Sequence, residues 1–374
     1  MEIIHLILGK ANPERMNGVN KVVFELASKQ TAQGLNVQVW GITQNPEHDY
    51  PPRNFSTRLF MAGRNPFSIN AKLRQAIAEK QGKAVFHIHG GFVPRFYTAA
   101  LWMKKHTIRF VFTPHGSYNS IARRKSSLRK KLYTYLFERK LLEAASVVHC
   151  IGQSEVNGLH EVMPGKAAML LPYGFEAAPD CAPRHEPDAN FIVGFCGRID
   201  VYTKGLDALI EGFAVFAKHA PGTQLWVIGD GAELSRLRDM VVSHGIQSNV
   251  KFWGSRYGTD KTALLKHISV FAHPSRNEGL PASVLEAASL GVPCLITEAT
   301  NLAEAVQNYH AGEVIQRTSA AEVERALHKL YSEIQNGKMP ALRYGARQMI
   351  RQAFSWERII PEFQQLYTQA WKAI

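Results

Sequence analysis

Short apolar segments alternate with amphipathic segments along the 374 residues of this chain. This alternation predicts parallel β-sheets covered by helices, because parallel strands need a long crossover connection and a helix usually supplies it. Helices are expected between the strands and, near the end of the chain, over about 319–335, 340–353 and 357–372. The apolar segments that we expect to form strands are Ile3–Leu8, Val37–Trp40, Val85–His89, Phe110–Thr113, Val147–Cys150, Ile192–Cys196, Gln224–Ile228, Val250–Trp253, Val270–His273 and Cys294–Thr297.

The alternation runs twice, and the two runs are separated by a segment with the composition of a linker. Residues 177–190 contain three prolines and no periodic apolar pattern. A chain of this length also exceeds what one hydrophobic core usually organises. The sequence therefore predicts an α/β protein with two Rossmann-like, doubly wound parallel-sheet domains facing one another across a cleft. The expected domains are residues 1–178 and 190–355.

Composition and cysteine spacing narrow the class of protein. The chain is 45% hydrophobic and 20% charged, which is typical of soluble globular proteins. The N-terminus lacks a basic region and a cleavage site, so we expect it to form the first strand. The four cysteines have no metal-like or redox-like spacing, and we expect reduced thiols and a cytoplasmic location. They are Cys150, Cys181, Cys196 and Cys294.

Positive charge is concentrated in the first half of the chain. Residues 1–180 contain 24 lysines and arginines against 12 acidic residues, a net charge of +12. Residues 181–374 contain 20 against 19, a net charge of +1. One basic half beside a neutral half suggests two faces with different partners.

A turn with two glutamates follows the predicted strand Val270–His273. Its sequence, Glu278-Gly279-Leu280-Pro281-Ala282-Ser283-Val284-Leu285-Glu286, opens a predicted helix that ends at Gly291. Pro281 suits the first turn of that helix, where an N–H would lack a partner. The free amides of the turn can bind an anion, and the two carboxylates can accept hydroxyl hydrogens. The segment therefore predicts a site for a sugar phosphate.

Basic residues are expected near the same edge of the second sheet. Gly197-Arg198 ends one predicted strand, and Lys204-Gly205 precedes the next helix. A basic pair at the carboxyl end of parallel strands suits a diphosphate. The alternative is that both side chains are simply solvated on a loop.

Three segments of the first half are candidates for the opposite side of the site. Asn17-Gly18-Val19 lies in the first strand-to-helix turn, where glycine lets a phosphate approach the backbone. His87-Ile88-His89-Gly90-Gly91 and Thr113-Pro114-His115-Gly116-Ser117 each follow a strand, and we expect their histidines to lie in approachable loops. A metal site at His87 and His89 is the alternative, although no carboxylate supports it.

The ordered set of motifs resembles the family 4 retaining glycosyltransferases (glycosyl transferases group 1), which have the GT-B architecture. The resemblance covers nearly the whole chain and implies that the helix 357–374 completes the N-terminal domain. The motifs that carry it are Asn17-Gly18-Val19, His115-Gly116, Gly197-Arg198, Lys204-Gly205, Gly229-Asp230-Gly231, the two glutamates Glu278 and Glu286, and Ser355-Trp356-Glu357.

The resemblance implies a role for each matching residue. Gly18 would bind the β-phosphate of the donor, Arg198 and Lys204 its diphosphate, and Glu286 its ribose. Glu278 would lie at the donor sugar. The remaining donor contacts would come from Gly279, Leu280, Pro281, Ala282 and Ser283 of the turn and, at the base, from Gly254, Ser255 and Arg256. The catalytic residues would be His115, Arg198, Lys204 and Glu278, and the acceptor side would be formed by Asn17, His89 and His115.

Three positions depart from the usual family pattern, and they bear on donor preference more than on fold. Asn17 replaces the first glycine of a pair, Tyr173-Gly174 replaces Asn-Gly, and Thr300-Asn301 replaces a glycine pair.

The chemistry of the predicted site favours transfer over hydrolysis. A glycosidase needs one protonated carboxyl, whereas a helix N-terminus and nearby cations keep Glu278 and Glu286 ionised. The chain has no Asp-x-Asp motif, so we expect no metal and no cofactor beyond the nucleotide-sugar co-substrate. The resemblance implies retention of configuration by front-face displacement, in which the leaving phosphate helps deprotonate the acceptor.

A basic segment in the first half suggests where the acceptor is found. Arg123–Lys131 carries six cations in nine residues and is followed by Leu132, Tyr133, Tyr135, Leu136 and Phe137. Such a segment can lie on an anionic membrane, and many family members modify lipid-linked saccharides. The alternative is a solvated helix that packs its apolar side into the domain.

We therefore expect a hexosyltransferase that acts on a saccharide or lipid-linked saccharide, in bacterial polysaccharide or lipopolysaccharide biosynthesis. A UDP-sugar is the first expectation for the donor and GDP-mannose the second. The expected location is the cytoplasm, with a peripheral position on the inner face of the membrane. The alternatives are a GT-B sugar-nucleotide epimerase and a basic nucleic-acid-binding protein, although no nucleic-acid-binding motif is present.

Overall fold

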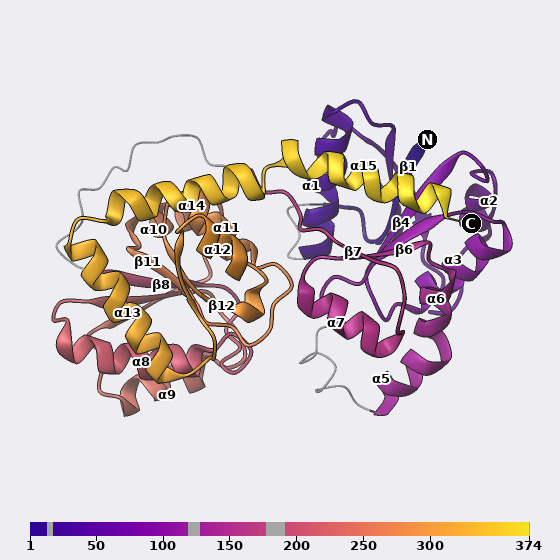
Figure 1. Cartoon of the computed structure of the whole chain (residues 1–374). Coiled ribbons are helices and arrows are strands. Elements are labelled where there is room, and N and C mark those ends of the chain that lie inside the picture. The colour runs from indigo at the N-terminus through magenta and orange to yellow at the C-terminus, as the bar shows by residue number, and fades with distance from the viewer. Residues whose placement is uncertain (13–17, 119–127, 177–190, 374) are drawn as a thin grey trace. The chain divides into compact units, whose positions relative to one another are not determined.

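The computed structural model describes residues 1–12, 18–118, 128–176 and 191–373. The chain divides into two compact units (Figure 1). Unit 1 consists of Met1–Gly174 together with Trp356–Ile374, and unit 2 consists of Phe175–Ser355. The last helix therefore belongs to unit 1, although all of unit 2 separates it in the sequence from the rest of unit 1.

Unit 1 is built on a seven-stranded sheet in the order β3-β2-β1-β4-β5-β6-β7. All neighbouring strands are parallel. Every residue of β4, β5 and β6 is buried, as expected for parallel strands with both faces covered. The strands are β1 (Glu2–Leu8), β2 (Val37–Thr43), β3 (Ser56–Met61), β4 (Ala84–His89), β5 (Phe110–Thr113), β6 (Val147–Cys150) and β7 (Ala168–Leu170).

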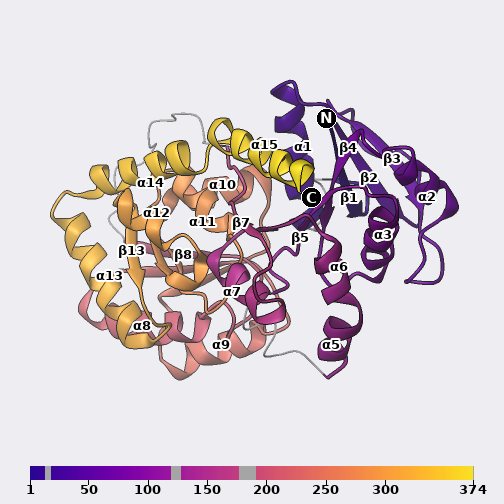
Figure 2. The same cartoon turned by 45° about the vertical axis from the view of Figure 1, so that its right-hand side comes forward.

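The two faces of this sheet differ in chemistry. Alternate strand residues such as Phe86 and Ile88 pack in an apolar core with α2 (Ala71–Ala78), α3 (Pro94–Lys105) and α6 (Arg139–Ala144). The residues between them point to the opposite face, because side chains alternate along a strand. That face contacts α15 (Trp356–Lys372), which lies alongside α1 (Gly18–Ala32) in Figure 2. The other helices in the described part of unit 1 are α5 (Leu128–Tyr133), the π-helix η1 (Thr134–Glu138) and α7 (Gln153–Val162).

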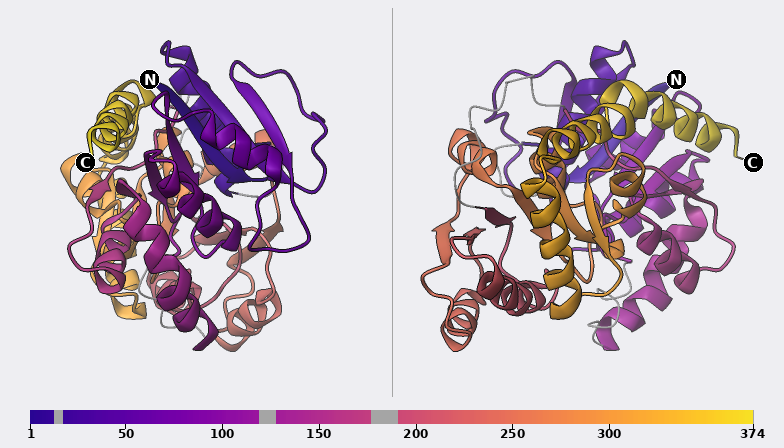
Figure 3. Two further views of the ribbon diagram at one scale, coloured as in Figure 1. Left: turned by 90° about the vertical axis from the view of Figure 1, so that its right-hand side faces the viewer. Right: turned by 60° about the vertical axis from the view of Figure 1, so that its left-hand side comes forward.

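Unit 2 repeats the plan with a six-stranded parallel sheet in the order β10-β9-β8-β11-β12-β13. Separate apolar cores occupy its two faces, and the views in Figure 3 show helices beside the sheet. The strands are β8 (Ile192–Cys196), β9 (Gln224–Ile228), β10 (Val250–Gly254), β11 (Val270–His273), β12 (Cys294–Thr297) and β13 (Gly312–Ile315). The helices are α8 (Leu206–His219), α9 (Leu234–Ser243), α10 (Gly258–His267), α11 (Ala282–Ser289), the 3-10 helix η2 (Glu298–Thr300), α12 (Ala303–Asn308), α13 (Ala320–Gln335) and α14 (Met339–Ala353).

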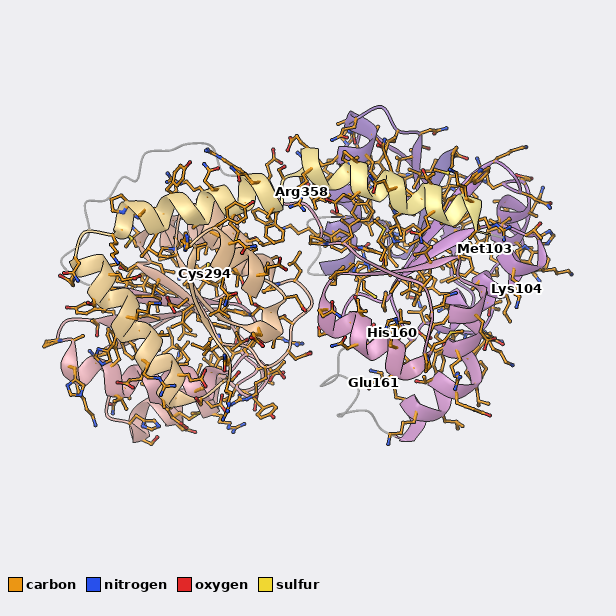
Figure 4. All side chains as sticks on the ribbon, in the orientation of Figure 1. Met103, Lys104, His160, Glu161, Cys294 and Arg358 are labelled. Carbon is orange, nitrogen blue, oxygen red and sulfur yellow. The ribbon has the colours of Figure 1, made fainter. Side chains whose placement is uncertain are left out.

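The described cysteines are buried free thiols: Cys150, Cys196 and Cys294. Cys294 lies in β12 in the interior of unit 2 (Figure 4). Burial raises the pKa of the Cys294 thiol to about 12. A thiol that stays protonated is a poor nucleophile and a poor metal ligand, so these cysteines serve packing. Cys181 lies outside the described residues.

None of the helices in the described part of the chain combines the length and apolar character needed to span a bilayer.

Candidate functional site

The turn with two glutamates lies directly between β11 and α11 in unit 2. The helix begins at Ala282, and Pro281 is its N-cap residue. The expectation that Pro281 lies in the first turn is therefore wrong by one position, because its backbone is still extended. Its carbonyl oxygen accepts hydrogen bonds from the amides of Val284 and Leu285. The amides of Ala282 and Ser283 come earlier and have no acceptor within the helix, so they can bind an anion.

Glu278 is held between a lysine and a histidine. Its Oε1 atom accepts a hydrogen bond from the Lys204 ammonium and another from Nε2 of His273 at 2.7 Å. Burial alone would raise the pKa of Glu278, but the His273 hydrogen bond and the Lys204 charge outweigh burial and lower the pKa to about 2. The carboxylate is therefore ionised at any physiological pH. It can accept hydroxyl hydrogens but cannot act as a general acid.

Asn301 fixes the backbone of this turn. Its side-chain amide donates to the carbonyl oxygens of Glu278 at 2.9 Å and Gly279 at 2.7 Å. Asn301 itself has a φ of 58°, which is the left-handed conformation that glycine adopts most easily. Asparagine is the residue that combines tolerance of this conformation with a side-chain donor. The departure noted at Thr300-Asn301 thus keeps the conformation of a glycine and adds two hydrogen bonds.

Gly205 lets the loop that carries Lys204 pack against the end of β11. It has a φ of 66°, and a Cβ atom there would lie 1.9 Å from the Pro274 carbonyl oxygen. The Thr203 carbonyl also accepts the amide of Arg276 at 2.9 Å. These close contacts bring Lys204 to Glu278 across the edge of the sheet.

The second glutamate of the turn pairs with a lysine that the sequence did not indicate. Nζ of Lys261 in α10 lies 2.6 Å from Oε2 of Glu286. Both side chains are about one-fifth exposed. No motif or fixed spacing links Lys261 to Glu286, so only the packing of α10 beside α11 reveals the pair.

Two further basic residues on the donor side of unit 2, Arg198 and Arg256, are exposed. Arg198 follows β8 and is exposed, and it takes part in none of the ion pairs found among the described residues. Gly254 ends β10 with a φ of 66°, and Arg256 two residues later is exposed. The structure therefore brings Lys204 and Glu278 together, whereas Arg198 and Arg256 extend from the same sheet without joining them.

In unit 1, Gly18 is the first residue of α1 and is exposed. Open space surrounds the position that a Cβ atom would occupy there. A ligand could therefore approach its backbone closely. Asn17 lies outside the described residues.

His115 occupies a strained turn after β5. It has a φ of 53°, an uncommon conformation for a residue other than glycine. Buried Glu155 holds the turn, because its carboxylate accepts the Gly116 amide at 2.5 Å and the Ile151 amide at 3.0 Å. Glu155 is a supporting residue that the sequence did not indicate. His115 is partly exposed, so it remains within reach of a ligand.

The expectation that His87 and His89 lie in an approachable loop is wrong. Both belong to β4, and they are 0% and 2% exposed. The strand continues to the glycines, so both histidines point into the covered face of the sheet. His89 contacts His115, with Nδ1 and Nε2 3.0 Å apart. His89 can therefore affect a ligand only through His115.

The metal alternative meets a related difficulty. His5, His87 and His89 place ring nitrogens within 4.8 Å of one another, a spacing compatible with a metal ion. All six of their ring nitrogens, however, lie within hydrogen-bond distance of another group. The geometry is that of a hydrogen-bonded cluster.

Two family comparisons match the two halves of the chain. Residues 16–174 match "Glycosyltransferase Family 4", and residues 182–349 match "Glycosyl transferases group 1". Together the two matches leave only short segments of the chain unmatched.

Individual relatives are distant. The D-inositol 3-phosphate glycosyltransferase of Salinispora arenicola is 28% identical over 193 residues, which is 49% of this chain and 42% of the relative. The match therefore spans less than half of that relative's length. The N-acetyl-alpha-D-glucosaminyl L-malate synthase of Bacillus anthracis is 21% identical over 96% of this chain and 91% of its own. The solved structure of Anabaena HepE in complex with UDP has a TM-score of 0.73 at 16% identity and covers 98% of this chain and 100% of its own.

Proposed function

Because this chain belongs to glycosyltransferase family 4 and has the GT-B fold, we propose that it moves a hexose-type sugar from a nucleoside-diphosphate sugar to an acceptor hydroxyl with retention of configuration. The observation that carries the proposal is the ionised Glu278 carboxylate between Lys204 and His273 at the head of α11. That arrangement brings a hydroxyl acceptor, a cation and free amides together at the head of α11.

Lys204 can hold the leaving diphosphate without releasing Glu278. A lysine ammonium has three N–H donors, and one hydrogen bond to Glu278 leaves two for phosphate oxygens. The amides of Ala282 and Ser283 add neutral donors, and exposed Arg198 adds a second cation. These groups would stabilise the charge that develops on the departing diphosphate. On this proposal, transfer needs no metal ion, because basic side chains neutralise the leaving group.

The chemical step balances within the substrates. The bond between the anomeric carbon and the phosphate oxygen breaks, and a bond from that carbon to the acceptor oxygen forms on the same face. The acceptor proton passes to the leaving phosphate oxygen. Glu278 remains ionised and orients sugar hydroxyls, so the protein contributes positioning and electrostatic stabilisation.

The donor base is the least constrained part of the proposal. UDP bound to HepE, which shares this fold, supports a uridine nucleotide, with GDP-mannose as the second candidate. Gly254, Ser255 and Arg256 would lie at the base, and Lys261 would orient Glu286 toward the ribose. The acceptor would be a saccharide or lipid-linked saccharide in bacterial polysaccharide or lipopolysaccharide assembly.

We further propose that unit 1 contacts an anionic membrane surface from the cytoplasmic side. Helix α5 and the π-helix η1 leave Leu132, Tyr135 and Leu136 57%, 69% and 40% exposed. Tyr133 and Phe137 instead face inward onto the ring of Phe67. One side of this helical segment thus packs into the domain, as the alternative to membrane contact also expected. The other side exposes apolar residues that could contact lipid. Residues 119–127, which include most of the basic segment, lie outside the described residues.

A nucleotide-sugar panel tests the proposed function. The right donor should raise the melting temperature of the protein, because ligand binding stabilises the folded state. Nucleoside diphosphate should then be released only when a saccharide acceptor is added. Interconversion of the donor sugar without acceptor would instead indicate an epimerase. Salt-sensitive binding of random duplex DNA, without any donor binding, would indicate a nucleic-acid-binding protein.

A further inference from the structure

A continuous hydrogen-bonded chain runs through the covered face of the unit 1 sheet, from His115 to a backbone carbonyl. We call it the histidine chain. Its eight side chains come from strands β1, β4, β5 and β6, the β5 turn, α1 and α15, and each lies between 2.6 and 3.1 Å from the next. In order they are His115, His89, His5, Gln30, Tyr367, His87, Thr113 and His149, and the chain ends at the Leu171 carbonyl oxygen.

The carbonyl at the end of the histidine chain fixes the direction of the first hydrogen bonds. Nε2 of His149 lies 2.7 Å from the Leu171 oxygen, and a carbonyl can only accept, so Nε2 carries the hydrogen. Neutral His149 must then accept at Nδ1 from the Thr113 hydroxyl at 2.8 Å. Since Thr113 donates there, it accepts from Nε2 of His87 at 2.6 Å.

The same logic continues to the other end. Nδ1 of His87 accepts from the Tyr367 hydroxyl at 3.0 Å, so Tyr367 accepts from the Gln30 amide at 3.1 Å. The Gln30 oxygen then accepts from Nε2 of His5 at 2.8 Å.

The last two hydrogen bonds lead to His115, the partly exposed end of the histidine chain. Nδ1 of His5 accepts from Nε2 of His89 at 2.9 Å, and Nδ1 of His89 accepts from Nε2 of His115 at 3.0 Å. Every neutral histidine in the chain is thus the Nε2–H tautomer. The lone pair of His115 is left on Nδ1.

The environment keeps these histidines neutral. Burial lowers the pKa of His5 and of His149 to about 4 and that of His115 to about 3. Burial and the neighbouring histidines hold the pKa values of His87 and His89 well below their usual range. A proton taken up at His115 could not leave at the far end either, because the Leu171 carbonyl is no proton acceptor. The histidine chain therefore orients His115 and does not relay protons.

We propose that the histidine chain is a positioning device that presents Nδ1 of His115 to the ligand as a fixed hydrogen-bond acceptor. The group that it recognises must be a donor, such as a sugar hydroxyl, and cannot be a phosphate or carboxylate oxygen. The inference rests on the proposed function for the identity of that ligand, but the orientation of His115 is a property of the free protein. Thr113 and Gln30 are positioning residues on this account, since neither reaches the ligand.

The tautomer can be measured without any substrate. Long-range proton–nitrogen NMR of the ¹⁵N-histidine-labelled protein at pH 7, assigned with His115→Gln, should show a protonated Nε2 and an unprotonated Nδ1 at His115. Thr113→Val removes the hydroxyl that donates to His149 and accepts from His87, so the direction of the later hydrogen bonds is no longer fixed. His115 should then be a mixture of both tautomers. Thr113→Ser keeps the hydroxyl and should restore the Nε2–H form.

Thr223→Val is the matched control, because Thr223 is a buried threonine of unit 2 whose hydroxyl has no hydrogen-bond partner among the described residues. With the donor identified, Thr113→Val should lower kcat/KM about tenfold, and Thr113→Ser and Thr223→Val should leave it near wild type.

An Nδ1–H or doubly protonated His115 at pH 7, or one zinc ion per protein on His5 and His89, would overturn the inference. The expected tautomer in a protein that binds no nucleotide sugar would refute the proposed function alone.

Discussion

At the scale of single residues, one candidate site residue in each unit has a charge state that its surroundings fix. Glu278 is kept ionised by His273 and Lys204, and His115 is kept neutral by burial. Each group is thereby restricted to hydrogen bonding. Neither Glu278 nor His115 then has to change its protonation state near neutral pH when a charged and hydroxyl-rich donor binds.

Lys204→Ala tests the role of the lysine in leaving-group departure. We expect kcat to fall about 10²- to 10³-fold, because a cation aimed at the departing charge acts mainly in the transition state. The dissociation constant of the donor should change much less. Steady-state kinetics and calorimetry measure the two effects, with Lys329→Ala as a control lysine in a salt bridge to Glu313 elsewhere in unit 2. Unchanged turnover in Lys204→Ala would refute the leaving-group role.

Asn301 offers a graded test of the turn. Asn301→Gly keeps the left-handed backbone but removes two hydrogen bonds, so we expect about 1–2 kcal/mol lower stability and a higher KM for the donor. Asn301→Ala should lose about 1 kcal/mol more, because alanine is strained at a φ of 58°. Thermal melting and donor kinetics give the order. A glycine variant as stable and as active as wild type would show that the side-chain amide is dispensable.

At the scale of elements, the buried strands are the ones whose bounds the sequence predicts best. Strands β5, β6, β8, β9, β11 and β12 have the expected bounds, because uninterrupted apolar runs mark fully buried parallel strands. The expectation missed β3, β7 and β13, which are edge strands with exposed or half-buried positions. Polar residues hide the apolar signal in β3 and β13, and β7 is only three residues long. The strand β2 also extends three residues beyond the expected end at Trp40.

The sequence also predicts only some of the candidate site residues. Local motifs indicated Lys204, Glu278 and His115, which the structure places at the ends of strands. Lys261 and Glu155 could not be predicted, because they meet Glu286 and Gly116 only through the packing of separate elements. His273 lies only five residues before Glu278, but no motif marks it as the partner of that carboxylate. His89 was expected to be approachable because glycines follow it, whereas its side chain is 2% exposed at the end of β4.

The exposed side of α5 and η1 carries a prediction about membranes. We expect the wild type to bind vesicles that contain phosphatidylglycerol at low salt, since apolar side chains insert where nearby cations meet anionic headgroups. The triple variant Leu132→Ser, Tyr135→Ser, Leu136→Ser should bind about tenfold more weakly. Leu101→Ser is the matched control, because Leu101 is an exposed leucine of α3 in the same unit but lies outside α5 and η1. Failure of the wild type to co-sediment with such vesicles would refute membrane contact.

At the scale of the whole molecule, the neutral histidines couple the stability of unit 1 to pH. His5, His87, His89 and His149 are buried, and their folded pKa values lie below the unfolded value of 6.5. The unfolded state therefore binds more protons below pH 6.5, and stability is lost as pH falls from 6.5 toward about 4. Each histidine should remove roughly 2 kcal/mol between pH 7 and pH 5.

Hydrogen exchange measures this effect within unit 1. Amide protection in β4 and β5, corrected for intrinsic exchange, should fall steeply between pH 7 and pH 5, and the α13 amides of unit 2 should be less affected. Equal protection of β4 at both pH values would show that the histidines do not charge on unfolding as argued.

We propose that ionised Glu278 binds the sugar of a nucleotide-sugar donor, and paired calorimetric titrations measure this contact. Wild type and Glu278→Gln are each titrated with the matching donor and with its nucleoside diphosphate alone. We expect Glu278→Gln to bind the intact donor at least about tenfold more weakly, because a carboxylate that accepts sugar hydroxyls is lost, while nucleoside diphosphate binding changes little. An equal change in affinity for both ligands, or none, would contradict it.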